Sequence, residues 1–426
     1  MEYVYSYLPR LTFVFPNGVK VESHVIKSIV KHFGFTVNFF PIYECECLVP
    51  LQFTSLFRVN QNSVYAILEI KKERRSGTAI ESSEVILNHI FVPFFTPDSF
   101  NEFINTDIEK QRGNSTNEAS MLTADLKMAL YSATGLAANK KLLNFVAEDC
   151  DVGTMMKFLV DQTDIEKVLI DKPDNETVYS NLVITPHNIN LALKELQVRY
   201  GVYNNGMTCF YDPPMLYIMN RYSLTHDHED KKPNKILIKS LVKNPANNIG
   251  VSKVTEKKDG TIEYFSTAMP SPVNQDVSLS EIFGNEVIFS NITLTTNMVA
   301  MKEGEFDSAI YPTQAIRSDS VRHDMTGVKS IVDYDEINNP YNINAVVKSA
   351  NLSTLISIAR INGVDVETIA PNTSVVLSIE DDKIRAQEYN GNYSIIAGEL
   401  VYEKSRVDDQ TMLCAARNII LSRMDS

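Results

Sequence analysis

Short runs of alternating hydrophobic and polar residues, separated by turn-forming pairs, dominate the chain. Alternation with a period of two places every second side chain on one face, which is the pattern of a β-strand. Asn-Gly and Asp-Gly pairs favour the tight turns of β-hairpins, because both central residues need positive φ. Five such pairs lie between runs rich in β-branched or aromatic residues: Asn17-Gly18, Asn205-Gly206, Asp259-Gly260, Asn362-Gly363 and Asn390-Gly391. The pattern predicts a mainly β protein with five hairpin turns.

The hydrophobic spacing changes between residues 116 and 215. Leucine and alanine recur at helical spacing from Leu122 to Ala133, and a second helical run covers residues 137–146. Asp151 is a suitable N-cap for a helix over 152–160. A further helix is expected from Asn188 to Tyr200, with a strand pair after it around the Asn205-Gly206 turn. This stretch predicts a helical or α+β insert between two β-rich regions.

The 426 residues exceed the size of one ordinary core, so two to four domains are expected. Strand patterns resume after residue 216, with loops predicted over 225–234 and 300–342 because these stretches are polar and weakly periodic. Residues 408–423 fit either a short helix or a strand, and the sequence pattern leaves both open.

Composition narrows the class of protein. A net charge of -13 makes the chain a poor candidate for gripping nucleic acid, because that affinity comes mostly from Lys and Arg neutralising phosphates. Five widely spaced Cys argue against a disulfide framework and favour folding in a reducing cytoplasm. The N-terminus lacks the pattern of a signal peptide, and the apolar runs are too short to span a bilayer, so no membrane anchor is expected.

Motifs of phosphate-binding loops, nucleophile elbows and zinc proteases are absent from the sequence, which therefore assigns no catalytic residue, cofactor or metal ligand. The best metal candidate is the run from His226 through Asp227 and His228 to Asp230, for which a solvated loop is the favoured reading. Cys45 and Cys47 could bind zinc with distant partners, but alternate residues of a strand more often share one half-buried face.

Two clusters have a possible role with nucleic acid. Lys71, Lys72, Glu73, Arg74 and Arg75 form the most concentrated basic run, which could bind phosphate but reads better as a solvated strand end. Tyr200, Tyr203, Phe210, Tyr211 and Tyr217 could stack on bases, although core or interface packing is favoured because few cations surround them. The acidic run Glu380-Asp381-Asp382 predicts a turn.

A succession of short segments opens with Phe40-Pro41-Ile42, 51–57 and 64–71. These segments resemble the first tube-type β-barrel domain of the baseplate hub proteins of contractile-tailed bacteriophages. Those that resemble the inserted domain are 152–162, 170–179, Ile184-Thr185-Pro186, 189–197, 200–206, 209–212 and 216–219. Residues 375–379 and 389–395 are similar to the closing hairpin of a tail-tube barrel.

The resemblance implies an α+β, mainly β fold with two tail-tube-type β-barrel domains and an inserted helical or α+β domain. Residues 1–115 would form the first barrel, 116–215 the insert and 216–426 the second β domain with long loops. Hubs of this family form trimers, so that six barrels match the six-fold tail tube. Each chain would then be a structural protein, assembled in the host cytoplasm and located in the virion at the tail baseplate.

As a hub, the protein would join the tail tube to the central spike and form part of the DNA channel. Its expected partners are two further copies of the chain, the tail tube protein, the central spike, baseplate wedge proteins and the tape-measure protein, while DNA passes through without specific binding. Two alternatives remain from the sequence. A tail-associated cell-wall hydrolase would need paired carboxylates or a metal in a cleft, and a receptor-binding tail protein would be an elongated trimer with repeats.

Overall fold

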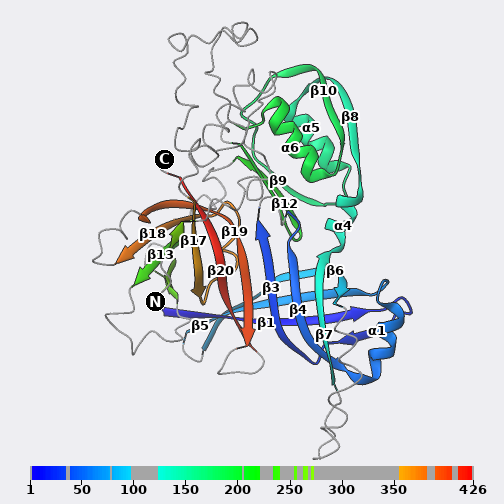
Figure 1. The fold of residues 1–426 in the computed structure, drawn as a ribbon, viewed down its shortest axis with the longest axis vertical. Helices are drawn as coiled ribbons and strands as arrows, with labels where there is room; N and C mark the ends of the chain where they lie inside the picture. Colours follow the sequence, from blue (N-terminus) through cyan, green and yellow to red (C-terminus); the bar gives the residue numbers. More distant parts are fainter. Residues whose placement is uncertain are drawn as a thin grey trace, which may run out of the picture.

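The computed structural model of the chain is strand-rich (Figure 1). It describes residues 2–34, 39–76, 79–96, 123–203, 206–220, 234–239, 254–256, 262–266, 270–272, 355–380, 389–404 and 411–424. The predicted loops over 225–234 and 300–342 lie almost wholly outside these residues. Among the described helices, none is both long enough and apolar enough to cross a membrane.

Eight antiparallel strands close into a barrel built from both ends of the chain. Around the barrel the order is β1, β5, β6, β7, β4, β3, β19 and β20, and β20 pairs back onto β1 between Met412 and Tyr7. Their bounds are β1 (Glu2–Val14), β3 (Val25–Gly34), β4 (Ile42–Pro50), β5 (Tyr65–Ser76), β6 (Ala79–Phe95), β7 (Thr123–Ser132), β19 (Gly391–Lys404) and β20 (Met412–Arg423). The barrel therefore draws strands from all three of the predicted domain ranges.

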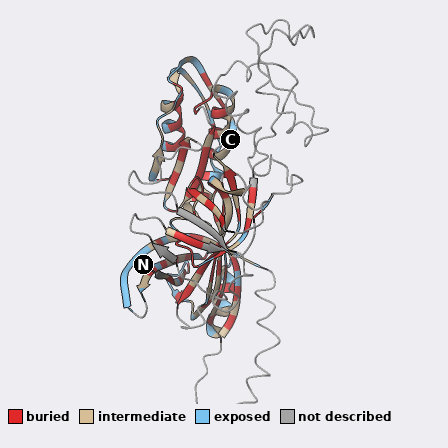
Figure 2. Ribbon diagram, turned by 90° about the vertical axis from the view of Figure 1, so that its left-hand side faces the viewer, coloured by how far each residue is buried: buried red, intermediate tan, exposed pale blue. Residues whose placement is uncertain are grey.

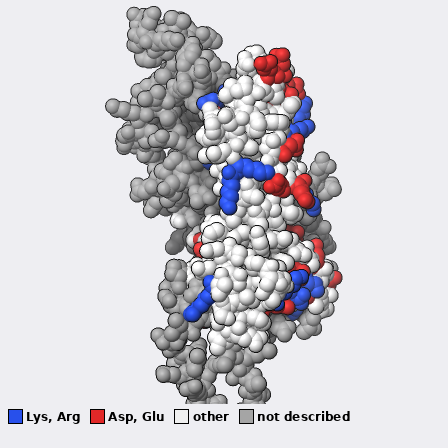
Figure 3. All heavy atoms as spheres, turned by 90° about the vertical axis from the view of Figure 1, so that its right-hand side faces the viewer, with Lys and Arg blue, Asp and Glu red and all other residues white. Residues whose placement is uncertain are grey.

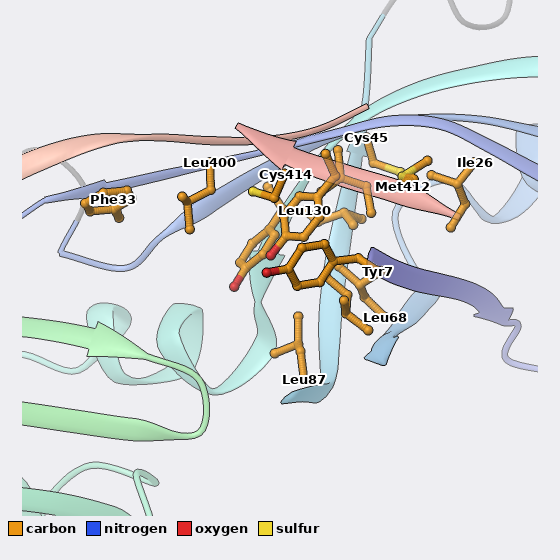
Figure 4. Close-up of a cluster of buried hydrophobic side chains, with 14 of the residues drawn as sticks. Tyr7, Ile26, Phe33, Cys45, Leu68, Leu87, Leu130, Leu400, Met412 and Cys414 are labelled. Carbon is orange, nitrogen blue, oxygen red and sulfur yellow. The ribbon is translucent and has the colours of Figure 1, made fainter. Parts of the chain in front are cut away.

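Side chains fill the barrel interior. Along β4, Tyr43, Cys45 and Cys47 are buried and alternate with residues that reach the surface, as a half-buried strand requires. Figure 4 shows side chains from opposite walls, among them Leu130 of β7 and Cys414 of β20, converging in this core. An eight-stranded barrel is just wide enough for its own side chains, so its interior is a packed core and offers no passage.

The predicted helix from Leu122 to Ala133 is wrong, because β7 covers most of these residues. Leu126, Met128 and Leu130 are buried at every second position, and β7 forms ladders with β4 on one side and with β6 on the other. The hydrophobic residues of this stretch fit the spacing of a helix and also the alternation of a strand. Pairing with the two neighbouring strands favours the extended conformation. Residues 408–423, which the pattern left open, include the strand β20.

The insert is a compact α+β unit that lies beside the barrel (Figure 1). Its elements are α4 (Ala133–Lys140), β8 (Leu143–Asp151), α5 (Val152–Asp161), β9 (Lys167–Ile170), β10 (Val178–His187), α6 (Ile189–Tyr200), β11 (Met207–Asp212) and β12 (Met215–Asn220). The predicted helices after Asp151 and from Asn188 to Tyr200 are confirmed as α5 and α6. The predicted N-cap Asp151 accepts a hydrogen bond from the Thr154 N–H, and Asn188 caps α6 in the same way by accepting from the Leu191 N–H. The run over 137–146 is helical only to Lys140, after which β8 begins.

The remaining described strands attach to one wall of the barrel. Here β18 pairs with β19, β17 pairs with β20, and β14 pairs with Glu2 and Tyr3 of β1. Their bounds are β13 (Asn234–Lys239), β14 (Val254–Glu256), β15 (Ile262–Ser266), β16 (Ser271–Pro272), β17 (Leu355–Asn362) and β18 (Ser374–Glu380). The mainly β fold is thus confirmed with one closed barrel, and the second barrel stays a prediction.

Two of the five predicted hairpins agree with the strand pairing. β2 (Lys20–Glu22) folds back on β1 around Asn17-Gly18, where Gly18 has a φ of 80°. β14 and β15 are antiparallel on either side of Asp259-Gly260, although that turn itself lies outside the described residues. Elements η1 (Leu51–Phe53) and α1 (Thr54–Asn60) connect β4 to β5.

The other three hairpin predictions are wrong. β11 begins after Gly206 and pairs with β12 across Pro213-Pro214. Gly363 ends β17, whose ladder partners are β20 and β16 rather than a strand directly after it. Gly391 lies in the ladder opposite Leu377, so it is not a central residue of a tight turn. Glycine also suits the ends of strands and other turns that need positive φ, which makes the dipeptide signal ambiguous.

Candidate assembly surface

The strand β6 extends well beyond its neighbour β7. The ladder with β5 covers β6 from Ala79 to Phe91, but only Phe91–Phe95 pair with β7. Every residue from Ala79 to Val85 is exposed, and this part of the strand projects beside the N-terminus (Figure 2). Among the described residues, the edge of β6 from 79 to 88 therefore has no neighbouring strand.

Two β-bulges determine which side chains of β6 lie on the outer face of the barrel. The register passes from Ile70↔Leu87 to Lys71↔Val85, and from Arg74↔Ser82 to Arg75↔Ile80, so one extra residue enters β6 at each step. Residues opposite each other in a ladder share a face, and each bulge reverses the alternation that follows. The bulges thus bring Ile80 and Val85 to the same face as Ile90.

This outer face of β6 carries a row of large apolar side chains that remain half exposed. The exposed fractions are 54% for Ile80, 55% for Val85, 50% for Ile90 and 53% for Phe94. Phe94 also contacts Tyr131 of β7, with 5.0 Å between the ring centroids. We call these four residues of β6 the β6 stripe. Rows of exposed apolar side chains are typical of surfaces that take part in interactions.

The charged residues of the same hairpin lie on both of its faces, and Lys71 and Arg75 stand opposite Val85 and Ile80 on the face of the β6 stripe. Lys72, which is 8% exposed, lies 3.2 Å from Asp365 and 3.1 Å from Glu84, and it also donates to Glu367. Arg74 lies 3.4 Å from Glu81. These pairs compensate the charges of both glutamates in the exposed part of β6.

Lys72 belongs to a buried polar cluster that ties β5 to the turn after β17. Burial alone would lower the pKa of Lys72, but the charges of Asp365 and Glu367 outweigh that effect and raise the pKa. Burial raises the pKa of Asp365, although the charge of Lys72 opposes the rise. Tyr7 donates from its hydroxyl to the Val364 carbonyl over 2.9 Å, which holds the same turn against β1. The prediction that this basic run is a solvated strand end is therefore wrong for Lys72. In the same run, Arg75 forms an ion pair with Glu73 over 2.6 Å.

A second ion pair, which is partly buried, joins the barrel to the insert. Lys31 of β3 donates to Asp212 at the end of β11 over 2.6 Å. Burial would lower the pKa of Lys31, but the charge of Asp212 outweighs burial and raises the pKa. Beside this pair, the Tyr211 ring contacts Phe40 and His89, and its backbone N–H donates to the Phe39 carbonyl over 2.8 Å. The insert is thus held on the barrel by polar and aromatic contacts together.

The aromatic residues singled out in the sequence are packed against protein. Tyr203, Phe210 and Tyr211 are buried, and the rings of Phe210 and Tyr217 stack with centroids 4.8 Å apart. Tyr200 accepts a hydrogen bond from the Val183 N–H over 2.7 Å. The packing interpretation is confirmed. On the side of the molecule in Figure 3, basic and acidic side chains are interspersed and no broad basic area appears.

The metal candidates give no site within the described part of the chain. Cys45 and Cys47 lie side by side in the barrel core with free thiols, as the structural interpretation predicted. No group of three His, Cys, Asp or Glu residues there is placed to hold a metal ion. The run from His226 to Asp230 lies outside the described residues, as do Asp381 and Asp382, whereas Glu380 ends β18.

Sequence reasoning missed the β6 stripe. Ile80, Val85 and Ile90 recur every five residues, a spacing that belongs to neither a regular strand nor a helix. Only the two bulges, which depend on the register with β5, place the three side chains on one face. An available signal was the absence of Pro and Lys from residues 79–90, since natural edge strands commonly carry such protective residues.

One family model matches almost the whole chain, over residues 5–422, and its description is the bacteriophage PBS1 gene 109 protein. No curated protein matches the sequence. Solved structures with a similar fold include a tail protein from Neisseria meningitidis MC58, with 10% identity, a TM-score of 0.44, and coverage of 99% of this chain and 96% of that one.

A 43 kDa tail protein of prophage MuSo2 from Shewanella oneidensis has 11% identity and a TM-score of 0.44, with 97% of this chain and 96% of that chain covered. The E. coli c3393 protein is a type VI secretion system component with structural similarity to the T4 bacteriophage tail proteins gp27 and gp5. Its identity is 6% and its TM-score 0.45, with 97% of this chain and 77% of that chain covered.

Proposed function

Because the chain belongs to the family of the bacteriophage PBS1 gene 109 protein, we propose that it is a structural protein of a phage tail and serves as the baseplate hub. The observation that carries the proposal is the closed eight-stranded barrel with an α+β insert. A barrel and an insert in this order are what the resemblance to hub proteins implied. The pairing of β13, β15 and β18 beyond β19 supports a second barrel-like unit, formed largely by residues 216–426.

The proposed hub is a homotrimer, so that two barrel-like units per chain match the six-fold tail tube. It joins the tube to the central spike and contacts the wedge and tape-measure proteins. Because side chains fill the barrel interior, the channel for DNA runs between the chains of the ring. The acidic net charge supports a conduit that does not hold DNA, because phosphate affinity rises with the number of cations presented.

The contacts found for the basic run support this role. Lys72, Arg74 and Arg75 face carboxylates of the same chain and are therefore poorly available to phosphates. Their ion pairs hold the β5–β6 hairpin in place. In the proposed hub, this run lies away from the DNA channel and stabilises the chain, and the protein acts without catalysis.

The test is the location of the protein in purified virions. In a cryo-electron microscopy reconstruction of the tail, three copies are expected at the end of the tube, next to the spike. Density for the chain only in fibres would overturn the hub and favour a receptor-binding protein. Clearing of peptidoglycan by the purified chain on a zymogram would instead favour the cell-wall hydrolase.

A further inference from the structure

We infer that His89 is a pH-sensitive switch at the contact between the barrel and the insert: the neutral ring holds the insert on the barrel, and protonation loosens it. The inference goes beyond the proposed tail role and does not depend on it. Its first basis is the route of the chain. β7 ends at Ser132, α4 begins at Ala133, and α4 leads from the barrel into the insert (Figure 1). The contacts of Ser132 therefore determine how the insert is attached.

The side chain of Ser132 joins β6 to the start of the connecting helix. Ser132 is 1% exposed, and its hydroxyl oxygen caps α4 by accepting from the Gly135 N–H over 3.1 Å. The same oxygen lies 2.7 Å from Nε2 of His89 on β6. The first turn of α4 is packed closely, since a Cβ on Gly135 would lie 2.6 Å from the Phe40 ring. A change at His89 thus acts directly on the cap of α4.

His89 also contacts the insert itself. Its ring meets Tyr211 of β11 edge-on, with 6.3 Å between the centroids, and it meets Phe91 of its own strand at 5.2 Å. Burial raises the pKa of Tyr211, and hydrogen bonding with Ser132 and Thr134 opposes that rise. His89, Ser132 and Tyr211 therefore form one cluster, which links the barrel, the connecting helix and the insert.

The hydrogen bonds of this cluster require a neutral imidazole. A serine hydroxyl has one hydrogen to donate. When Nε2 of neutral His89 is the acceptor, the Ser132 hydroxyl donates to the ring while its oxygen accepts from Gly135. A protonated ring carries an N–H on both nitrogens, so Nε2 no longer accepts and the hydroxyl loses this partner.

A positive charge on His89 would also lack compensation. The N–H groups at the start of α4 form the positive end of the helix dipole, and α4 has no acidic residue in its first turn. Across the ladder, β5 presents Leu68. On the insert side, Tyr211 is the titratable group in contact, and the next residue, Asp212, is paired with Lys31. Burial lowers the pKa of His89, and no charge of a described residue opposes this effect.

The sign of the pH dependence follows from this lowered pKa. His89 is half-buried, so solvent can supply a proton to the ring. When the insert leaves the barrel, the ring becomes solvated and takes up a proton near the ordinary pKa of about 6.5. The contact is therefore at full strength above about pH 7 and weakens as the pH falls below about 6.5. A single proton changes the equilibrium by at most about tenfold per pH unit.

The experiment follows hydrogen exchange of the full chain at about pH 7.5 and about pH 5.5, with rates corrected for the intrinsic effect of pH. His89→Gln keeps an acceptor for the Ser132 hydroxyl but takes up no proton. His187→Gln, in the insert and with a side chain that is 39% exposed, is the matched control. Residues 133–140 and 207–212 report on the contact, and residues 65–70 of β5 report on the barrel.

In wild type and His187→Gln, protection of residues 133–140 and 207–212 is expected to fall by about three- to tenfold at the lower pH, while residues 65–70 stay protected. In His89→Gln, protection of the same residues should change by less than about twofold. An equal loss in His89→Gln and wild type would overturn the inference and assign the response to another group. Unchanged protection in wild type, or a loss that includes residues 65–70 equally, would overturn it as well.

A second measurement needs only the wild-type chain and so does not depend on the folding of a variant. In nuclear magnetic resonance spectra of histidine-labelled protein, the His89 signal should titrate over the same pH range as the loss of protection. A ring that stays neutral throughout that range would contradict the switch.

Discussion

Single buried charges have a defined structural role in this protein. Lys72 lies inside a cluster with Asp365, Glu367 and Glu84, where its charge compensates carboxylates that burial would otherwise make unfavourable. Removing one partner of a buried pair leaves the other charge without compensation, and this costs more than the intact pair contributes. The geometry of the cluster therefore depends on Lys72 more than on any one of its partners.

Lys72→Met is expected to lower the free energy of unfolding by about 3 kcal/mol, because Asp365 is left buried without its cation. Without Lys72 the pKa of Asp365 rises further, so the folded variant holds a proton that the unfolded chain releases. A raised pKa in the folded state means that stability is lost as the pH rises. The free energy of unfolding of Lys72→Met should thus fall further below that of wild type at pH 8 than at pH 5.

Urea unfolding at the two pH values measures this effect. Lys172→Met is the matched control, because Lys172 and its partner Glu176 are exposed, and its unfolding midpoint should stay at the wild-type value. A Lys72→Met midpoint equal to wild type at both pH values would show that the cluster does not stabilise the fold.

The secondary-structure elements divide into those with local signals and those that depend on pairing. Helix α5 has a local signal, because the Asp151 carboxylate accepts from the Thr154 N–H over 2.8 Å and from its hydroxyl over 2.7 Å. Strand β7 depends on pairing, since its leucines fit a helix as well as a strand until β4 and β6 lie beside it. The β6 stripe likewise exists only because of the register with β5.

Asp151→Ala is expected to lower the free energy of unfolding by about 1 kcal/mol, because an N–H of the first turn of α5 loses its acceptor. The hydrogen bonds from the side chain and N–H of Thr154 lower the pKa of Asp151. Because the pKa of Asp151 is lower in the folded chain than in the unfolded chain, the carboxylate stabilises the fold at pH values above its unfolded pKa. This stabilisation is lost as the pH falls through the folded pKa. The difference in the free energy of unfolding between wild type and Asp151→Ala should therefore become smaller below about pH 4.

Thermal unfolding of the full chain at several pH values is the measurement. Asp151→Asn should keep most of the capping at neutral pH, and Asp161→Ala at the other end of α5 should change stability by less than about 0.5 kcal/mol. An Asp151→Ala variant as stable as wild type at pH 7 would argue against the cap.

The architecture of the chain joins its two ends. β19 and β20 complete the barrel that β1 to β7 begin, with β19 beside β3 and β20 beside β1. The contacts that close the barrel thus span almost the full length of the sequence, so the barrel cannot close before most of the chain is available. The N-terminal region is consequently not an independent unit.

A chain that ends at residue 388 lacks β19 and β20, and it should fail to unfold cooperatively because β3 loses its neighbour and the core is opened. Near-ultraviolet circular dichroism and thermal melting measure the loss. Co-expression of residues 389–426 as a separate peptide should restore part of the signal. A cooperative transition of the shortened chain at the wild-type temperature would show that the N-terminal strands fold without the C-terminal pair.

The amino-acid sequence alone established the mainly β class, the helices α5 and α6, the hairpin at Asn17-Gly18 and the buried character of Cys45 and Cys47. These features depend on interactions within a few residues or on the burial preference of one side chain. Tertiary structure decided the strand β7, the closure of the barrel by β19 and β20, the burial of Lys72 and the β6 stripe. Each of these requires partners distant in the chain, and the register of such partners is set by the packing of the whole core.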